Sequence, residues 1–413
     1  MDLDACMKVK SMNILFLTEL LYPHGSGAEL ATYLWAKLLA ESGNKVRAVT
    51  NRFPSEPERS ERGNLEIFRL PILGACASLK YSILKRFDIL LSDFVRKLLA
   101  WADVICIPKF WYSAIPIAKA YGKPVITHLH DYVPVCPLAT LYDLSKNRIC
   151  DSQYSCRPSC IITHERAHGK NFLETLGSTL LNLAIWRYVS RLVELSDGVV
   201  CVSKAQRDIM IAHMPSLAGK CYMIYNPLPE LSEIEINGRD MGYFGGPSLL
   251  KGFNVLCSAL KYVKNKVTIH ATGFDPSKQG LIQFSNKSRI LFYERLPQSL
   301  YEQIHKETHT VLVPSIWAEP FGYVVAEAIL QGRLVIASKV GGVPEQVNGC
   351  PGVFSFESGD YRHLAELIEY VNDLSVETIR DLAAKNREVF LKRFDNKKIE
   401  QDLMRLLERT VAS

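Results

Sequence analysis

The sequence contains no apolar run long enough to cross a membrane. Its longest stretch without a charged residue, Thr175 to Trp186, falls short of the roughly 18–20 residues that a membrane-spanning helix needs. The first eleven residues, Met1 to Ser11, are polar and charged and lack the apolar centre of a secretion signal. We therefore expect a cytoplasmic protein in which residues 1–11 form a tail.

The sequence also lacks an excess of either charge. Its 49 Lys and Arg against 43 Asp and Glu give a net charge of +6 over 413 residues. So small and scattered a positive charge does not predict nucleic-acid binding, but it permits contact with an anionic membrane or a phosphorylated ligand. An apolar content of 48% is that of a globular protein, and the length is enough for two or three domains.

No repeat and no low-complexity segment interrupts the strand and helix patterns. The first strand–helix–strand unit spans residues 13–50. It begins with an apolar run at 13–18 and a glycine loop at 25–29, and it continues with leucines at helical spacing and a second apolar run at 45–50. That pattern is typical of a doubly wound parallel sheet, although the loop lacks the third glycine of a dinucleotide fingerprint. Further short strands are predicted at 103–107, 124–128 and 197–203.

The strand–helix pattern restarts after a polar stretch. Residues 226–240 read as a linker, and a strand at 241–245, a helix at 253–262 and a strand at 267–270 follow. The sequence thus predicts an α/β protein with two doubly wound domains, 12–225 and 241–395. A polar amphipathic helix at 396–413 is expected to return to the first domain.

Two segments of the first domain carry weaker signals. Residues 53–71 are rich in Pro, Glu, Arg and Ser and are predicted to be an exposed loop. Residues 83–98 form an amphipathic pattern with a basic polar side. Such a helix either lies on an anionic membrane or packs on the core with a solvated face, and both interpretations stay open.

Eleven cysteines are many for a protein without a secretion signal, and most should be reduced. Four of them fall in a polar loop, at spacings of 14, 6 and 4 residues that match no standard zinc ribbon: Cys136, Cys150, Cys156 and Cys160. Four thiolates can hold a structural zinc ion, with His164 and His168 as spare ligands. Free or disulfide-bonded cysteines are the alternative.

The segment from Val311 to Gly332 is the most informative part of the chain. A short apolar strand is followed by Pro320, which tolerates the first position of a helix, and Gly332 marks the helix end. Two carboxylates stand eight residues apart, Glu319 before the helix and Glu327 within its apolar run. They either bind hydroxyl groups of a ligand beside a helix start or serve as a capping residue and an ion-pair partner.

His130 and Asp131 follow the strand at 124–128 directly. Ligands of open α/β sheets bind at the carboxyl ends of strands, so His130 is a candidate substrate contact. A structural histidine hydrogen-bonded to Asp131 explains the pair equally well.

Taken together, these motifs resemble the retaining nucleotide-sugar glycosyltransferases of group 1, which have two Rossmann-like domains facing across a cleft (the GT-B fold). The resemblance covers nearly the whole chain in the correct order. It rests on the Glu-x7-Glu pattern 319–327, Val340-Gly-Gly-Val-Pro-Glu345, Tyr243-Phe-Gly-Gly246 with Lys251, Ile290 to Pro297, Gly25 to Glu29, and His130-Asp131.

The resemblance implies a role for each matching residue. Glu327 would bind the ribose, Glu319 the transferred sugar and Lys251 the diphosphate, with His130 facing the donor sugar. The remaining donor-binding residues implied are Phe321, Gly322, Tyr323, Gly246, Gly27, Arg295 and Gly273. A lysine and a helix start stabilise the charge of a leaving nucleoside diphosphate electrostatically.

Three features bear on this resemblance. The family usually has an arginine where this chain has Gly246, and a glycine where it has Glu294. The Asp-x-Asp metal motif of other sugar transferases occurs only as Asp2-Leu-Asp4 in the tail, so we expect a metal-independent reaction without a catalytic cofactor.

The function expected from the sequence is therefore a retaining glycosyltransferase. It would use a UDP- or GDP-sugar, act on a glycan or lipid-linked acceptor, and sit in the cytoplasm or peripherally on the membrane face. A nucleotide-sugar epimerase of the same fold and a non-catalytic nucleotide-sugar-binding protein are the alternatives. The Glu-x7-Glu pattern argues against the first, and Gly246 leaves room for the second.

Overall fold

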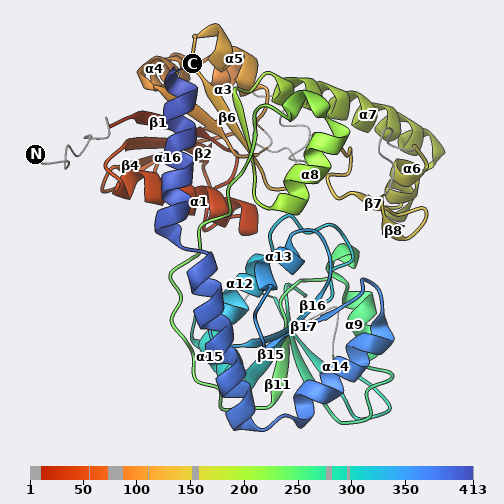
Figure 1. The fold of residues 1–413 in the computed structure, drawn as a ribbon. Helices are drawn as coiled ribbons and strands as arrows, with labels where there is room; N and C mark the ends of the chain where they lie inside the picture. Colours follow the sequence, from red (N-terminus) through yellow and green to blue (C-terminus); the bar gives the residue numbers. More distant parts are fainter. Residues whose placement is uncertain are drawn as a thin grey trace, which may run out of the picture.

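The protein folds into two α/β domains, one above the other in Figure 1, joined by the linker and by the C-terminal helices. The computed structural model describes residues 11–54, 56–72, 87–109, 111–150, 158–275, 281–294 and 298–412. Each domain is built around one mainly parallel sheet.

The N-terminal domain contains an eight-stranded sheet in the order β10-β9-β6-β5-β1-β2-β4-β3. Its pairs are parallel except the edge pair β3–β4. The strands are β1 Asn13–Leu17, β2 Lys45–Asn51, β3 Arg59–Arg62, β4 Leu65–Leu70, β5 Val104–Ile107, β6 Val125–Leu129, β9 Gly198–Cys201 and β10 Cys221–Met223. Its helices are α1 Gly27–Glu41, α3 Phe87–Leu90, α4 Asp93–Trp101, α5 Ala114–Ala120, α6 Pro158–Ala167, α7 Phe172–Glu194, α8 Lys204–His213 and the 3-10 helix η1 Pro215–Leu217. A small separate hairpin pairs β7 Tyr142–Asp143 with β8 Arg148–Ile149.

The C-terminal domain contains a seven-stranded sheet in the order β13-β14-β12-β11-β15-β16-β17. Only the edge strand β13 is antiparallel to its neighbour. The strands are β11 Asp240–Tyr243, β12 Thr268–Thr272, β13 Ile282–Gln283, β14 Arg289–Tyr293, β15 Thr308–Val313, β16 Leu334–Ser338 and β17 Val353–Phe356. The helices are η2 Leu249–Lys251, α9 Phe253–Ala259, α11 Gln298–Glu307, α12 Tyr323–Leu330, α13 Val343–Val347, α14 Tyr361–Asp373 and α15 Val376–Arg393. The last helix, α16 Asn396–Ala412, packs on α1 and β5 of the N-terminal domain.

The two sheets confirm the predicted fold of two doubly wound domains. Residues 53–71 were wrongly predicted to be a loop. They contain β3 and β4, an antiparallel pair at the sheet edge, and β4 also pairs with β2 and buries Leu65 and Ile67 on one face. The amphipathic segment 83–98 is two short helices in its described part, because the Ser92 hydroxyl caps a new helix by accepting from the Val95 amide.

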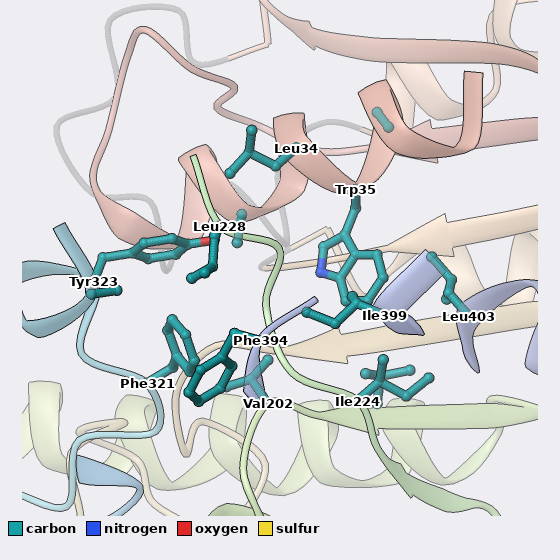
Figure 2. Packing of buried hydrophobic residues seen from close by; sticks show 14 of the residues in the cluster. Leu34, Trp35, Val202, Ile224, Leu228, Phe321, Tyr323, Phe394, Ile399 and Leu403 are labelled. Carbon is teal, nitrogen blue, oxygen red and sulfur yellow. The ribbon is translucent and has the colours of Figure 1, made fainter. Parts of the chain in front are cut away.

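A shared apolar cluster joins the two domains (Figure 2). Helix α16 crosses back to the N-terminal domain and buries Leu403 and Ile399 beside Trp35 of α1. Phe394, at the end of α15, packs edge-on against Phe321 of the C-terminal domain. The cleft between the sheets is therefore closed at its base by hydrophobic packing.

Candidate active site

The largest cavity between the two domains, about 590 Å³, lies at the carboxyl ends of both sheets. The N-terminal domain lines it with the glycine loop after β1 and with residues that follow β5 and β6. The C-terminal domain contributes the loop after β11 and residues 312–327. Parallel sheets leave their loops at this edge, which is where ligands of open α/β folds bind.

Glu319 is buried in this cavity and is held from several sides. One carboxylate oxygen accepts hydrogen bonds from the Ser315 hydroxyl (2.9 Å) and from the Lys251 ammonium (2.5 Å). Its carbonyl accepts from the Gly342 amide at 2.7 Å. Gly341, with a φ of +51°, packs so closely that a β-carbon there would lie 2.1 Å from that carbonyl oxygen. The two glycines after Val340 therefore fix the position of Glu319.

Helix α12 starts at Tyr323, three residues later than the predicted start at Pro320. The delay arises because Gly322 is held outside the helix: its amide donates to Gln346 Oε1 (3.1 Å) and its carbonyl accepts from Gln346 Nε2 (3.3 Å). Residues 320–322 thus form a buried turn that leads from Glu319 to the helix. Phe321, Gly322 and Tyr323 all line the main cavity.

Glu327 lines both this cavity and a second one of about 360 Å³. Within the part of the chain that the structure describes, no hydrogen-bond donor or cation contacts its carboxylate, so the predicted ion-pair alternative has no partner there. Burial alone raises the pKa of Glu327 to about 7. A carboxylate in this state is poised to accept hydrogen bonds from a ligand.

The second cavity is lined by aromatic and small residues. Phe244 stacks on His305 with ring centroids 5.0 Å apart, and Gly273 and Glu294 also line this cavity. Glu294 lies in the segment Ile290 to Pro297, on which the family resemblance partly rests. Arg295, the donor-binding residue that the resemblance implies in that segment, lies outside the described residues.

Residues 243–251, called the phosphate loop because the resemblance implies that Lys251 binds the diphosphate, place Lys251 in the main cavity but not Gly246. Gly246 has a φ of +69°, and its carbonyl accepts from the Tyr243 hydroxyl at 2.9 Å. A β-carbon at Gly273 would lie 3.1 Å from the Gly246 α-carbon, so these two glycines allow their loops to pack together. This left-handed backbone suits glycine better than the arginine that the family usually has there.

The glycine loop of the N-terminal domain approaches the C-terminal domain closely. A β-carbon on Gly27 would lie 3.0 Å from the Tyr323 ring. Two residues on, Glu29 closes a capping box by accepting from the Ser26 amide at 2.6 Å. Burial raises the pKa of Glu29, but the nearby Lys109 ammonium (3.3 Å) and the backbone amides outweigh it, so the pKa is lowered overall.

His130 lines the main cavity, and its Nε2 atom is buried with no partner among the described residues. Burial first, and Lys109 second, lower its pKa to about 3, so the ring is neutral near pH 7. Asp131 uses one carboxylate oxygen to accept from the Val133 amide at 2.9 Å. A neutral imidazole with an unused nitrogen fits the predicted contact to a hydroxyl group better than the structural alternative.

Lys109 and Trp317 are among the residues of this cavity that the sequence did not predict. Lys109 follows β5 at its carboxyl end, and that position was the available signal. Trp317 lies in the loop before Glu319, and the Lys251 ammonium stands 5.3 Å from its ring centroid. Lys109 supplies a cation from the domain opposite Lys251.

The cysteine loop encloses a cavity of about 560 Å³ beside α7 and α8. Cys136, Cys150 and Cys160 line it, and none forms a disulfide, while Cys156 lies outside the described residues. The three described sulfurs do not gather within 4.8 Å of one another; among the described residues only Asp240, His270 and Glu307 form such a group. The zinc site stays a prediction.

Two family models match successive parts of the chain. Residues 25–229 match Glycosyltransferase Family 4, and residues 238–373 match Glycosyl transferases group 1. Their junction coincides with the linker, and apart from residues 22–24 the residues that line both cavities lie within the matched ranges. The chain belongs to the GT-B-fold glycosyltransferases of group 1. The predicted group 1 family and the glycosyltransferase class are thereby confirmed, whereas the retaining mechanism stays a prediction.

Two relatives match this glycosyltransferase over most of their length. One is an uncharacterized 42.6 kDa protein in the cps region of Klebsiella pneumoniae, 24% identical over 84% of this chain and 90% of the relative. The other is an uncharacterized glycosyltransferase of Methanocaldococcus jannaschii, 24% identical over 68% of this chain and 83% of the relative.

Solved structures share the fold at low sequence identity. Sucrose-phosphate synthase from Thermosynechococcus elongatus matches with a TM-score of 0.70 at 16% identity, over 97% of this chain and 99% of that one. HepE of Anabaena in complex with UDP-glucose gives 0.61 at 20% identity, over 96% and 100%. WaaG, a glycosyltransferase involved in lipopolysaccharide biosynthesis, gives 0.58 at 13% identity, over 95% and 99%.

The glycosyltransferase contains, in its described part, no helix that is both long and apolar enough to cross a membrane.

Proposed function

We propose that this chain is a retaining glycosyltransferase that uses a UDP- or GDP-sugar and glycosylates a glycan or lipid-linked acceptor without a metal ion. The observation that carries the proposal is the order in which the candidate side chains line the two adjoining cavities. Glu319 and Lys251 stand in the main cavity, and Glu327 stands where it adjoins the second cavity. The sugar, the diphosphate, the ribose and the base of one donor would follow that order.

Each proposed contact follows from the chemistry of the side chain. Glu319 and neutral His130 exchange hydrogen bonds with hydroxyls of the transferred sugar. The Lys251 ammonium, which already contacts Glu319, balances the charge that grows on the leaving diphosphate. Glu327 accepts from the ribose hydroxyls, and the walls beside Phe244 take the base.

The proposed mechanism is attack from the same face as the leaving group. The acceptor hydroxyl bonds to the anomeric carbon as the bond from that carbon to the phosphate oxygen breaks, and its proton passes to the departing phosphate. The anomeric configuration is retained. Lys109 and Lys251 are the lysines lining the main cavity among the described residues, and they act on this charge from opposite domains.

The proposed location is the cytoplasm, with peripheral contact to the cytoplasmic face of the membrane. HepE was solved with UDP-glucose and WaaG acts in lipopolysaccharide biosynthesis, which supports a nucleotide-sugar donor and a lipid-linked acceptor here.

The test is transfer of radiolabel from UDP- and GDP-sugars to membrane extract, followed by NMR of the product linkage. Lys251→Met should lower kcat by at least about 100-fold, as for removal of one group that stabilises developing charge. Lys261→Met, an exposed lysine after α9, is the matched control. Isomerised donor, an inverted linkage, or binding of every donor without turnover would each refute the proposal.

A further inference from the structure

Helices α6 and α7 form a hairpin that projects from the N-terminal domain, away from the linker and the C-terminal helices (Figure 1). The first half of α7 has its polarity reversed. Its outward side chains are apolar and largely exposed, from 41% for Leu181 to 77% for Leu173. The apolar stripe of α7 comprises Phe172, Leu173, Leu176, Leu180 and Leu181.

The side of the same half-helix that faces α6 is polar. Thr175, Thr179 and Asn182 are at most 5% exposed. Asn182 donates to Glu165 of α6 at 3.1 Å, and Lys170 bridges Glu165 and Ser178. The polar groups are thus satisfied inside the hairpin while the leucines face outward, the reverse of the arrangement that water favours.

Two arginines continue the outward face of α7. At 100° per residue, Arg187 and Arg191 lie on the same side as Leu173, Leu176 and Leu180. Both are exposed, although each also borders the cysteine-loop cavity. Neither has an ion-pair partner among the residues that the structure describes. The acids nearby are engaged: Glu174 caps the helix by accepting from the Asn171 amide, and Glu194 accepts from the Ser216 hydroxyl.

We propose that the α6–α7 hairpin docks on an anionic lipid bilayer, with the apolar stripe inserted at the boundary of headgroups and acyl chains and the two arginines on lipid phosphates. An apolar surface outside and satisfied polar groups inside suit a helix whose outer face is in lipid. Cations in line with the stripe complement a negative membrane surface.

A second copy of the chain fits the hairpin less well. The stripe offers five side chains, whereas a standard protein interface uses about 20–30 residues on each side. A protein interface would also leave the two arginines in need of acids on the opposing surface. A membrane satisfies both the apolar stripe and the cations.

The experiment is flotation of the full chain with vesicles, either of phosphatidylcholine alone or of phosphatidylcholine with an equal share of phosphatidylglycerol. The wild type should float with the anionic vesicles. The triple variant Leu173→Ser, Leu176→Ser, Leu180→Ser should lose at least about tenfold in partition coefficient, because burial of a single leucine corresponds to about that factor. The control removes three exposed apolar side chains elsewhere, Val376→Ser, Leu391→Ser and Val411→Ser, and should float like the wild type.

The arginines are tested separately. Arg187→Gln with Arg191→Gln should reduce binding to anionic vesicles and abolish the preference for them over neutral ones. The proposal is overturned if the wild type does not float with anionic vesicles, or if the triple variant floats as well as the control. It is equally overturned if light scattering finds a wild-type dimer that the triple variant dissociates, because the stripe then binds a second copy.

Discussion

Glu327 is partly buried at the meeting point of two cavities, and its carboxylate has no internal partner in the described part of the chain. Its environment raises the pKa to about 7 because ionising a carboxylate away from water is unfavourable. A protein keeps such a group only where a ligand or another function compensates for it. In the proposed donor complex, the ribose hydroxyls supply the missing hydrogen bonds.

The raised pKa of Glu327 predicts a stability that depends on pH. The folded state holds the proton more tightly than the unfolded state, whose value is near 4.5, so stability is lost as pH rises from there through about 7. Glu327→Gln should remove this loss and be more stable than the wild type above pH 7 by at most about 3 kcal/mol. Urea denaturation at about pH 5 and about pH 8 measures it.

Glu302→Gln is the control, because Glu302 is exposed on α11 and should change stability little at either pH. The same pH dependence in wild type and Glu327→Gln would show that Glu327 does not titrate in this range. Glu327→Gln should also lose nucleotide-sugar affinity in calorimetry, so that greater stability accompanies weaker binding.

Among the elements, the phosphate loop depends most on backbone geometry. Gly252 joins η2 to α9 with a φ of +77°, and a β-carbon there would lie 1.7 Å from the Pro314 carbonyl oxygen. This contact holds the loop carrying Lys251 against the strand that leads to Glu319. The chain can pass here only without a side chain.

Gly252→Ala should therefore destabilise the protein by at least about 2 kcal/mol, because the clash adds to the strain of a left-handed backbone. Gly43→Ala is the matched control: Gly43 has a φ of +88° but no atom within 4 Å of its β-carbon position. That variant should lose only about 1–2 kcal/mol. Urea denaturation compares the two, and equal losses would mean that the Pro314 contact relaxes without cost.

The cysteine loop makes a separate element-scale prediction. If four thiolates close a structural zinc site, purified protein should contain about one zinc ion per chain by mass spectrometry. The zinc ion should be lost when four cysteines are replaced by serine together: Cys136, Cys150, Cys156 and Cys160. The control Cys257→Ser, on α9, should keep the zinc ion. If the wild-type protein contains no stoichiometric zinc, the zinc prediction is wrong and the cysteines are free or disulfide-bonded.

At the scale of the whole molecule, α16 and α13 hold the two domains together. Glu345 of α13 accepts from the Lys204 and Ala205 amides at the start of α8 (3.0 Å each), so one carboxylate caps a helix of the opposite domain. Helix α16 buries Leu403 in the N-terminal core although it follows the C-terminal domain in sequence. These contacts position the two walls of the cleft.

Leu403→Ala should therefore lower the free energy of unfolding by about 2–5 kcal/mol, the usual loss for a buried leucine. Val411→Ala, on the exposed side of the same helix, should stay within about 0.5 kcal/mol. Chemical denaturation followed by circular dichroism measures both. Similar effects of the two variants would mean that α16 is not anchored by its apolar side.

The sequence by itself determined the fold class and the two carboxylates of the site. Short apolar runs that alternate with leucines at helical spacing are typical of a parallel sheet covered by helices. Glu319 and Glu327 are informative because acidic residues are unexpected beside buried apolar residues. The helix start was displaced because Gln346, distant in sequence, holds Gly322. The sequence pattern around the helix start cannot reveal a hydrogen-bond partner that is distant in sequence.

Only the tertiary structure decided which side of each helix is covered. Lys109 entered the cleft because β5 lies next to β1 in the sheet, an order that strand patterns do not encode. The uncharged run 175–186 became part of an inverted helix because α6 packs against its threonines and asparagine rather than its leucines. Composition fixes how much apolar surface a segment has, but the packing partner fixes the direction in which that surface points.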